Sequence, residues 1–281
     1  CALSLSTKLI RTMSPQYLMQ LCRGATNEAP SRCLTSLMVG SGYLARSLPL
    51  ETAVHLCSTA ESDGPAECLM AAVSKKYRPR ADLIISSSSH GGGSGGSGSG
   101  GSGSGSSVKR RKRLDPTSPY LLDLCSGAND AGPADCYRSL PESVGSDEQS
   151  SVEMCRGATG VGPALCVAHF LSVPTLRSAL KSRDLAGVLR DLCGSAANDG
   201  PSRCYEKAKN KVRLDSNTAL DLCVGAENHF PAECANALLS STGKNRGKLS
   251  TRTIDIDAVV SVCRMATTTT TTTLSATTTK D

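Results

Sequence analysis

The fourteen cysteines are the residues of this 281-residue chain whose type and spacing could do chemistry. Twelve of them form six pairs with ten residues between the two members, so each pair defines a Cys-x10-Cys segment. The pairs are Cys22 and Cys33, Cys57 and Cys68, Cys125 and Cys136, Cys155 and Cys166, Cys193 and Cys204, and Cys223 and Cys234. Such regular spacing is typical of a disulfide framework or of a metal site. Each segment is named below by its first cysteine.

A zinc site fits this spacing poorly. Structural zinc sites place about two to four residues between neighbouring ligands, and the four histidines of the chain share no register with the cysteines. These histidines are His55, His90, His169 and His229. We therefore expect disulfides and predict no metal and no cofactor.

Two disulfide pairings are open. Pairing within each segment leaves Cys1 and Cys263 over, whereas pairing each second cysteine with the next first cysteine leaves none over. The spacing within segments never varies, while the distance between segments runs from 19 residues (Cys136 to Cys155) to 57 residues (Cys68 to Cys125). We favour pairing within segments, because a fixed link would explain a fixed spacing. Peptide mapping that recovered Cys33 joined to Cys57 would contradict this choice.

Other residues recur with the cysteines and indicate the elements that position them. Apolar residues at positions −4, −1, 0 and +3 from the first cysteine lie on one face of a helix. Position −1 is Leu21, Leu56, Leu124, Met154, Leu192, Leu222 and, in a seventh partial copy, Val262. Position +3 is Ala25, Ala60, Ala128, Ala158, Ala196 or Ala226, and we expect this alanine at the end of the apolar stripe.

A proline follows eight residues after each first cysteine, and it predicts a second helix. The six prolines are Pro30, Pro65, Pro133, Pro163, Pro201 and Pro231. Proline fits the first position of a helix, where its missing N–H costs nothing. The apolar stripe then resumes at the second cysteine and four residues beyond it, at Leu37, Ala72, Leu140, Phe170, Ala208 and Leu238. The sequence therefore predicts an all-α fold of tandem, disulfide-stapled helical hairpins in two blocks.

The composition indicates small aliphatic cores in an oxidising compartment. The chain has no Trp, two Phe and six Tyr, so one large core filled by aromatic side chains is not expected. Disulfides stabilise small domains that bury too little surface, and they persist outside the cytosol. We predict an extracellular, cell-surface or secretory-lumen location. The chain starts at Cys1 without a signal-peptide pattern and contains no long apolar run, so we expect a fragment or processed form without a membrane span.

Composition shifts predict four regions. An N-terminal block of a partial copy and two hairpins covers residues 1–82, and a Gly/Ser-rich linker with a basic run covers 83–118. A C-terminal block of four hairpins and a partial copy covers 119–266, and a Thr-rich disordered tail covers 267–281. As a random coil the linker would span about 25 Å and tether the two blocks. The alternative is an insertion within one stack of hairpins.

The basic run at residues 109–113 carries five of the positive charges behind the formal net charge of +6, so the rest of the chain is nearly neutral. This distribution argues against specific nucleic-acid binding. The tetrad Arg110, Arg111, Lys112 and Arg113 is similar to the sites cut by furin-like secretory proteases. A solvated charge cluster and a polyanion contact are the other interpretations.

The repetition itself argues against catalysis, because a catalytic constellation occurs once and the distinctive residues here occur six times. Carboxylates near the loops, such as Asp63, Asp130, Asp199 and Glu227, are explained first by turn chemistry. We predict that the protein is not an enzyme.

Two parts of the chain carry a resemblance. The stretches Leu192-Cys193-Gly194 and Pro201-Ser202-Arg203-Cys204-Tyr205, with Leu21-Cys22-Arg23 and Cys33-Leu34, resemble the cysteine-rich repeats of the Golgi apparatus protein 1 type. Those repeats belong to a receptor-like protein of the secretory pathway that binds growth factors and selectins. The resemblance covers about half of each segment, and the extra cysteines of that repeat are missing here. It implies a helical, disulfide-linked secretory module and transfers neither a pairing nor a ligand.

These observations predict a secreted or cell-surface structural or adhesive repeat protein with a multivalent binding surface. The expected partner is a protein or glycan at the cell surface or in the matrix. The alternative is a secreted binding module or effector released by proteolysis at the basic run. An enzyme of unknown type is a more remote alternative.

Overall fold

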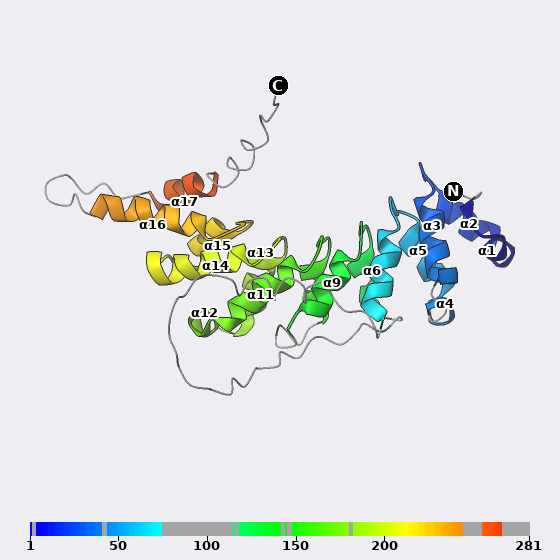
Figure 1. Cartoon of the computed structure of the whole chain (residues 1–281), viewed down its shortest axis with the longest axis horizontal. Helices are drawn as coiled ribbons and strands as arrows, with labels where there is room; N and C mark the ends of the chain where they lie inside the picture. Colours follow the sequence, from blue (N-terminus) through cyan, green and yellow to red (C-terminus); the bar gives the residue numbers. More distant parts are fainter. Residues whose placement is uncertain are drawn as a thin grey trace, which may run out of the picture. The chain divides into compact units, whose positions relative to one another are not determined.

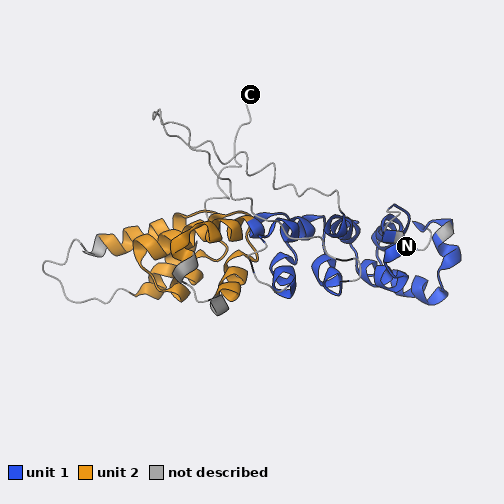
Figure 2. Cartoon of the chain, turned by 90° about the horizontal axis from the view of Figure 1, so that it is seen from below, with its two compact units in different colours: residues 1–164 blue, residues 165–281 orange. Residues whose placement is uncertain are grey.

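The computed structural model describes residues 4–40, 44–74, 118–141, 148–179, 182–243 and 255–265, together with Cys1, Asp115 and Val144. These residues form helices joined by loops and include no strand, which confirms the predicted all-α fold (Figure 1). The chain divides into two compact units, residues 1–164 and 165–281 (Figure 2). The basic run, almost all of the linker and the Thr-rich tail lie outside the described residues. The four predicted region boundaries therefore stay predictions.

Each Cys-x10-Cys segment contributes a first helix and a second helix. The first helices are α2 (Pro15–Cys22), α5 (Leu50–Cys57), α8 (Tyr120–Cys125), α10 (Glu148–Cys155), α13 (Ser182–Cys193) and α15 (Ser216–Cys223). The second helices are α3 (Ala29–Thr35), α6 (Gly64–Val73), α9 (Gly132–Ser139), α11 (Gly162–Ser172), α14 (Gly200–Lys207) and α16 (Phe230–Gly243). The partial seventh copy forms α17 (Ile256–Met265).

Short elements precede or connect these helices. They are α1 (Thr7–Thr12), α4 (Leu44–Ser47) and α12 (Pro174–Ala179), with the π-helical turns η2 (Ser36–Gly40) and η3 (Ala208–Val212). The turn η3 continues α14 directly, so α14 and η3 together form one long helical element from residue 200 to residue 212.

Within each compact unit the helices pack in two layers. In unit 1, α2 packs on α5, α5 on α8 and α8 on α10, while α3 packs on α6 and α6 on α9. In unit 2, α13 packs on α15 and α15 on α17, while α14 packs on α16. First helices therefore contact first helices, and second helices contact second helices. No helix of the described residues is long and apolar enough to cross a bilayer.

The predicted apolar stripes form the cores. The six residues at position −1 are at most 2% exposed, and Leu37, Ala72, Leu140, Phe170 and Ala208 are fully buried. Two predicted core residues are instead exposed, Leu238 at 39% and Val262 at 54%. They lie on α16 and α17.

The fixed Cys-x10-Cys spacing reflects a fixed loop. Each of the six first helices ends at its first cysteine, six loop residues follow, and the second cysteine is the fifth residue of the second helix. The alanine at +3 lies in the loop, where its N–H donates to the carbonyl of the first cysteine at 3.0–3.2 Å in all six segments. This corrects the expectation that the alanine lies on the helix. The proline at +8 is buried at the second helical position, one residue later than predicted.

Side chains at +5 accept a hydrogen bond at the start of the second helix in five of the segments. Asn27, Ser62, Asp130, Asn198 and Asn228 each accept a hydrogen bond from the N–H two residues on, at 2.7–3.0 Å. This is an Asx or Ser turn, which satisfies an N–H group at the start of a helix. The bond made by Asp130 supports the turn explanation offered for that carboxylate.

The predicted pairing of cysteines within segments is wrong. The seven disulfides join each second cysteine to the next first cysteine, and all fourteen cysteines take part. The pairs are Cys1 and Cys22, Cys33 and Cys57, Cys68 and Cys125, Cys136 and Cys155, Cys166 and Cys193, Cys204 and Cys223, and Cys234 and Cys263. Their Cα atoms lie 5.5–5.7 Å apart.

The physical reason is that the spacing and the bond have separate causes. Helix end, loop and proline fix the ten residues between the two cysteines of a segment. The bond depends only on how a second helix packs against the following first helix, as α6 packs on α8 and α14 on α15. The chain between these two helices can then have any length.

One consequence concerns the long linker. Helix α6 contacts both α8 and α9, and Cys68 is bonded to Cys125 across the linker. These contacts within unit 1 favour the alternative in which the Gly/Ser-rich segment is an insertion between packed helices.

Candidate functional site

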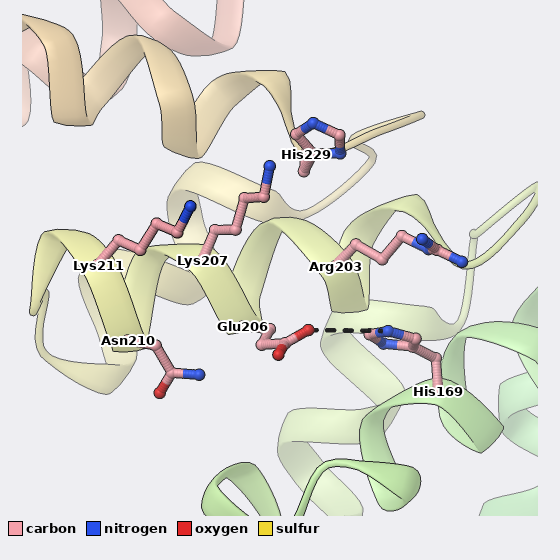
Figure 3. Close-up of a pocket in the computed structure, with 7 residues that line it drawn as sticks. All are labelled: His169, Arg203, Glu206, Lys207, Asn210, Lys211 and His229. Carbon is pink, nitrogen blue, oxygen red and sulfur yellow. Dashed lines mark ion pairs between the residues drawn. The ribbon is translucent and has the colours of Figure 1, made fainter. Parts of the chain in front are cut away.

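The residues that differ between segments on exposed helix faces are the candidates for binding, because the recurring residues are used by the fold. In the Cys193 segment, positions +10, +14 and +18 are Arg203, Lys207 and Lys211. The corresponding three positions of every other segment contain at most one Lys or Arg. The three cations are four residues apart along α14 and η3, so they lie along one side of the helix (Figure 3). We call them the basic row.

The basic row borders a pocket of about 350 Å³ in unit 2. Its lining residues are His169, Arg203, Glu206, Lys207, Asn210, Lys211 and His229. His169 comes from α11 and His229 from the loop before α16, so three parts of the fold meet at the pocket (Figure 3). Every lining residue is polar or charged.

Carboxylates flank the basic row. Lys207 Nζ lies 2.6 Å from Glu233 Oε1, and Arg203 Nε lies 2.7 Å from Asp199 Oδ2. His229 Nε2 lies 3.3 Å from the same oxygen of Glu233. The hydrogen bond from Lys207 lowers the pKa of Glu233. Two of the three cations are therefore paired with carboxylates, and these ion pairs are partly exposed rather than buried.

His169 lies between Ser202 and Glu206, a set of residue types that hydrolases use. Ser202 Oγ lies 3.1 Å from His169 Nδ1, and Glu206 Oε2 lies 3.7 Å from His169 Nε2. Burial lowers the pKa of His169, and Arg203 lowers it further, against the opposing effects of Glu206 and Asp199.

The geometry assigns Ser202 a structural role. Its side chain is fully buried, and its hydroxyl donates to the carbonyl of Asp199 at 2.8 Å. Ser31 occupies the same position, +9, in the Cys22 segment and donates to the carbonyl of Glu28 at the same distance. A hydroxyl that recurs in a helix start and is closed to solvent is no nucleophile. The set is thus explained by the fold.

The sequence-predicted site residues are placed as follows. The twelve cysteines predicted to form disulfides do so, with the corrected partners given above, while Arg110, Arg111, Lys112 and Arg113 lie outside the described residues. The described part of the chain contains no group of three or more His, Cys, Asp or Glu side chains placed to hold a metal ion.

The basic row is not among the site residues predicted from the sequence. Aligning the six segments and asking which exposed position differs would have found it, because Arg203, Lys207 and Lys211 share a helical face in a single segment. The pocket itself could not have been found in this way, since His169 and His229 come from other segments. No protein-family model, curated protein or solved structure matches this chain.

Proposed function

We propose that the chain is a structural or adhesive repeat protein of the extracellular space, the cell surface or the secretory lumen. In this role its stacked helices hold an array of exposed faces for binding other molecules, and it catalyses no reaction. The observation that carries the proposal is the ladder of seven disulfides, six of which join a second helix to the following first helix. Disulfides of this density form and persist in oxidising compartments, which supports the location.

Two further observations support a binding role. The residues that recur in every segment are used by loops, caps and cores, which leaves the exposed second-helix positions free to vary. Arrays of this kind present extended surfaces on which several weak contacts act together. The buried position of Ser202 supports the absence of a hydrolase-type site at His169.

The alternative of an effector released at the basic run meets a covalent obstacle. Cutting the chain between α6 and α8 leaves both parts joined through Cys68 and Cys125. Release would then require reduction as well as cleavage.

A cell-adhesion assay tests the proposal. Beads carrying the chain, produced through a secretory route, should adhere to cells or to cell-derived matrix. The same beads should not adhere after reduction and alkylation, because the disulfides that join the helices are then broken. Equal adhesion before and after reduction, or none with the oxidised chain, would contradict the proposal.

A further inference from the structure

The basic row is a linear set of cations that matches an extended anionic ligand. Arg203, Lys207 and Lys211 are four residues apart, and a helix rises about 1.5 Å per residue, so the row is about 12 Å long. A single phosphate or carboxylate could contact one or two of these side chains. A ligand with anionic groups at intervals could contact all three.

The pocket beside the row favours a hydrophilic ligand. Its lining residues include two histidines and Asn210, and no aliphatic or phenyl side chain is among them. Protein partners usually bind through buried aromatic or aliphatic anchors, and charged residues are depleted at the centre of such interfaces. Imidazole and amide groups beside cations match the hydroxyl and acidic groups of a sugar chain instead.

The carboxylates near the basic row do not prevent a ligand from binding to it. Asp199 and Glu233, the partners of Arg203 and Lys207, have side chains 34% and 51% exposed. Exposed ion pairs contribute little net free energy, so a ligand with several anionic groups can replace both partners. Stabilisation of the helix dipole explains cations in the last turn, at Lys207 and Lys211, but it does not explain the convergence of His169 and His229 from other elements.

We infer that the basic row and its pocket bind an acidic polysaccharide, whose sulfate or carboxylate groups contact Arg203, Lys207 and Lys211. The inference rests on the proposed function, because it names a ligand class for the adhesive surface. Neutral hydrogen-bonding groups of the sugar then contact Asn210 and the histidines.

Binding of the full chain to heparin, a sulfated polysaccharide, tests the inference. The chain is used with residues 109–113 all changed to Gln, so that the basic run does not bind the probe. In this background the triple variant R203Q/K207Q/K211Q should bind heparin about tenfold more weakly, because each exposed charge contact contributes a fraction of a kcal/mol. The single variant K211Q should bind about twofold more weakly.

The triple variant R11Q/R23Q/R46Q is the matched control. It removes the same charge from exposed arginines of unit 1 and should leave heparin binding unchanged. Equal weakening by both triple variants would overturn the inference, since net charge alone would then explain binding. Poly-glutamate that bound as tightly as heparin and lost binding in the same variant would also overturn it, because the site would then belong to acidic peptides.

The adhesion assay separates this inference from the proposed function. If R203Q/K207Q/K211Q binds heparin as tightly as its parent while beads that carry it still adhere, the polysaccharide site is overturned and the adhesive role stands.

Discussion

Glycine occupies position +7 in four of the six segments, with Ala29 at this position in the Cys22 segment, and it lets successive segments approach each other closely. Gly64 and Gly132 each begin a second helix in unit 1, and a Cβ atom at either position would overlap the backbone of the next loop, at Ala128–Asn129 and at Ala158–Gly160 respectively. In unit 2, Gly200 has the same relation to Glu227 and Asn228. The last complete segment has Phe230 at this position, 48% exposed. The glycine is thus a contact residue between segments.

Replacing Gly132 by Ala should destabilise the chain by about 1–3 kcal/mol, the usual cost of forcing a group into a packed site. The thermal unfolding midpoint measures this effect. Gly187→Ala is the control, because Gly187 lies inside α13 with nothing within 4 Å of its Cβ position. That change should stabilise the chain slightly, since alanine has the higher helix propensity. Equal effects of the two changes would contradict the close-packing explanation.

His169 makes stability depend on pH. Burial lowers its pKa below the ordinary value of 6.5 in the folded chain, and Arg203 adds to this effect. As the pH falls below about 6.5, the unfolded chain takes up a proton that the folded chain resists, so the free energy of unfolding falls until the folded pKa is passed.

The variant His169→Gln should therefore lose less stability than the parent between pH 7 and pH 5, as measured by urea unfolding. His55→Gln is the matched control, because it makes the same change at an exposed position of α5. A parent and His169→Gln that lost the same free energy over this range would rule the explanation out.

At the scale of elements, the sequence could predict helices but not their partners. Apolar residues at −1 and four after the second cysteine, together with the proline at +8, identified both helices of each hairpin. The prediction of the disulfide pairing was wrong because the pairing depends on packing between hairpins. No spacing within a hairpin encodes that packing. The requirement for glycine at +7 could not be predicted from the sequence for the same reason, since the groups that exclude a Cβ at Gly132 belong to residues 158–160 of the next segment.

Thiol counts distinguish the two pairings directly. The double variant C136A/C155A removes one disulfide, so it should contain no free thiol and should lose about 3 kcal/mol for a loop of this size. The double variant C125A/C136A removes partners from two disulfides and should expose two thiols, at Cys68 and Cys155. Thiol titration under denaturing conditions without reductant reads the result. The reverse pattern would restore pairing within segments.

At the scale of the whole chain, each disulfide closes a loop whose length varies from one disulfide to the next. The six-residue loop within a segment, whose length is constant, is not closed by a disulfide of its own. The loops between first and second helices have one length, whereas the bonded cysteines are 19 to 57 residues apart. Composition alone identified the long Gly/Ser-rich stretch. It could not show that the helices on both sides, α6 and α8, contact each other and are bonded, because that requires the packed structure.

This arrangement predicts the fate of a chain cut between α6 and α8. A furin-like protease acting at the Arg110–Arg113 tetrad should yield a chain that runs as one species of unchanged mass on a denaturing gel without reductant. With reductant it should separate into two fragments. The variant C68A/C125A, cut in the same way, should separate without reductant because it lacks the bond that spans the cut.

The outcome of this experiment decides between roles for the chain. If the cut parent stays together until reduction, cleavage changes the connectivity of an array whose parts remain joined, as an adhesive scaffold requires. Separation of the cut parent without reductant would mean that Cys68 and Cys125 are not bonded, and release of an effector by proteolysis alone would become the better account. A chain that the protease does not cut would show that the tetrad is not a cleavage site. The proposal would then rest on the disulfide-bonded array alone.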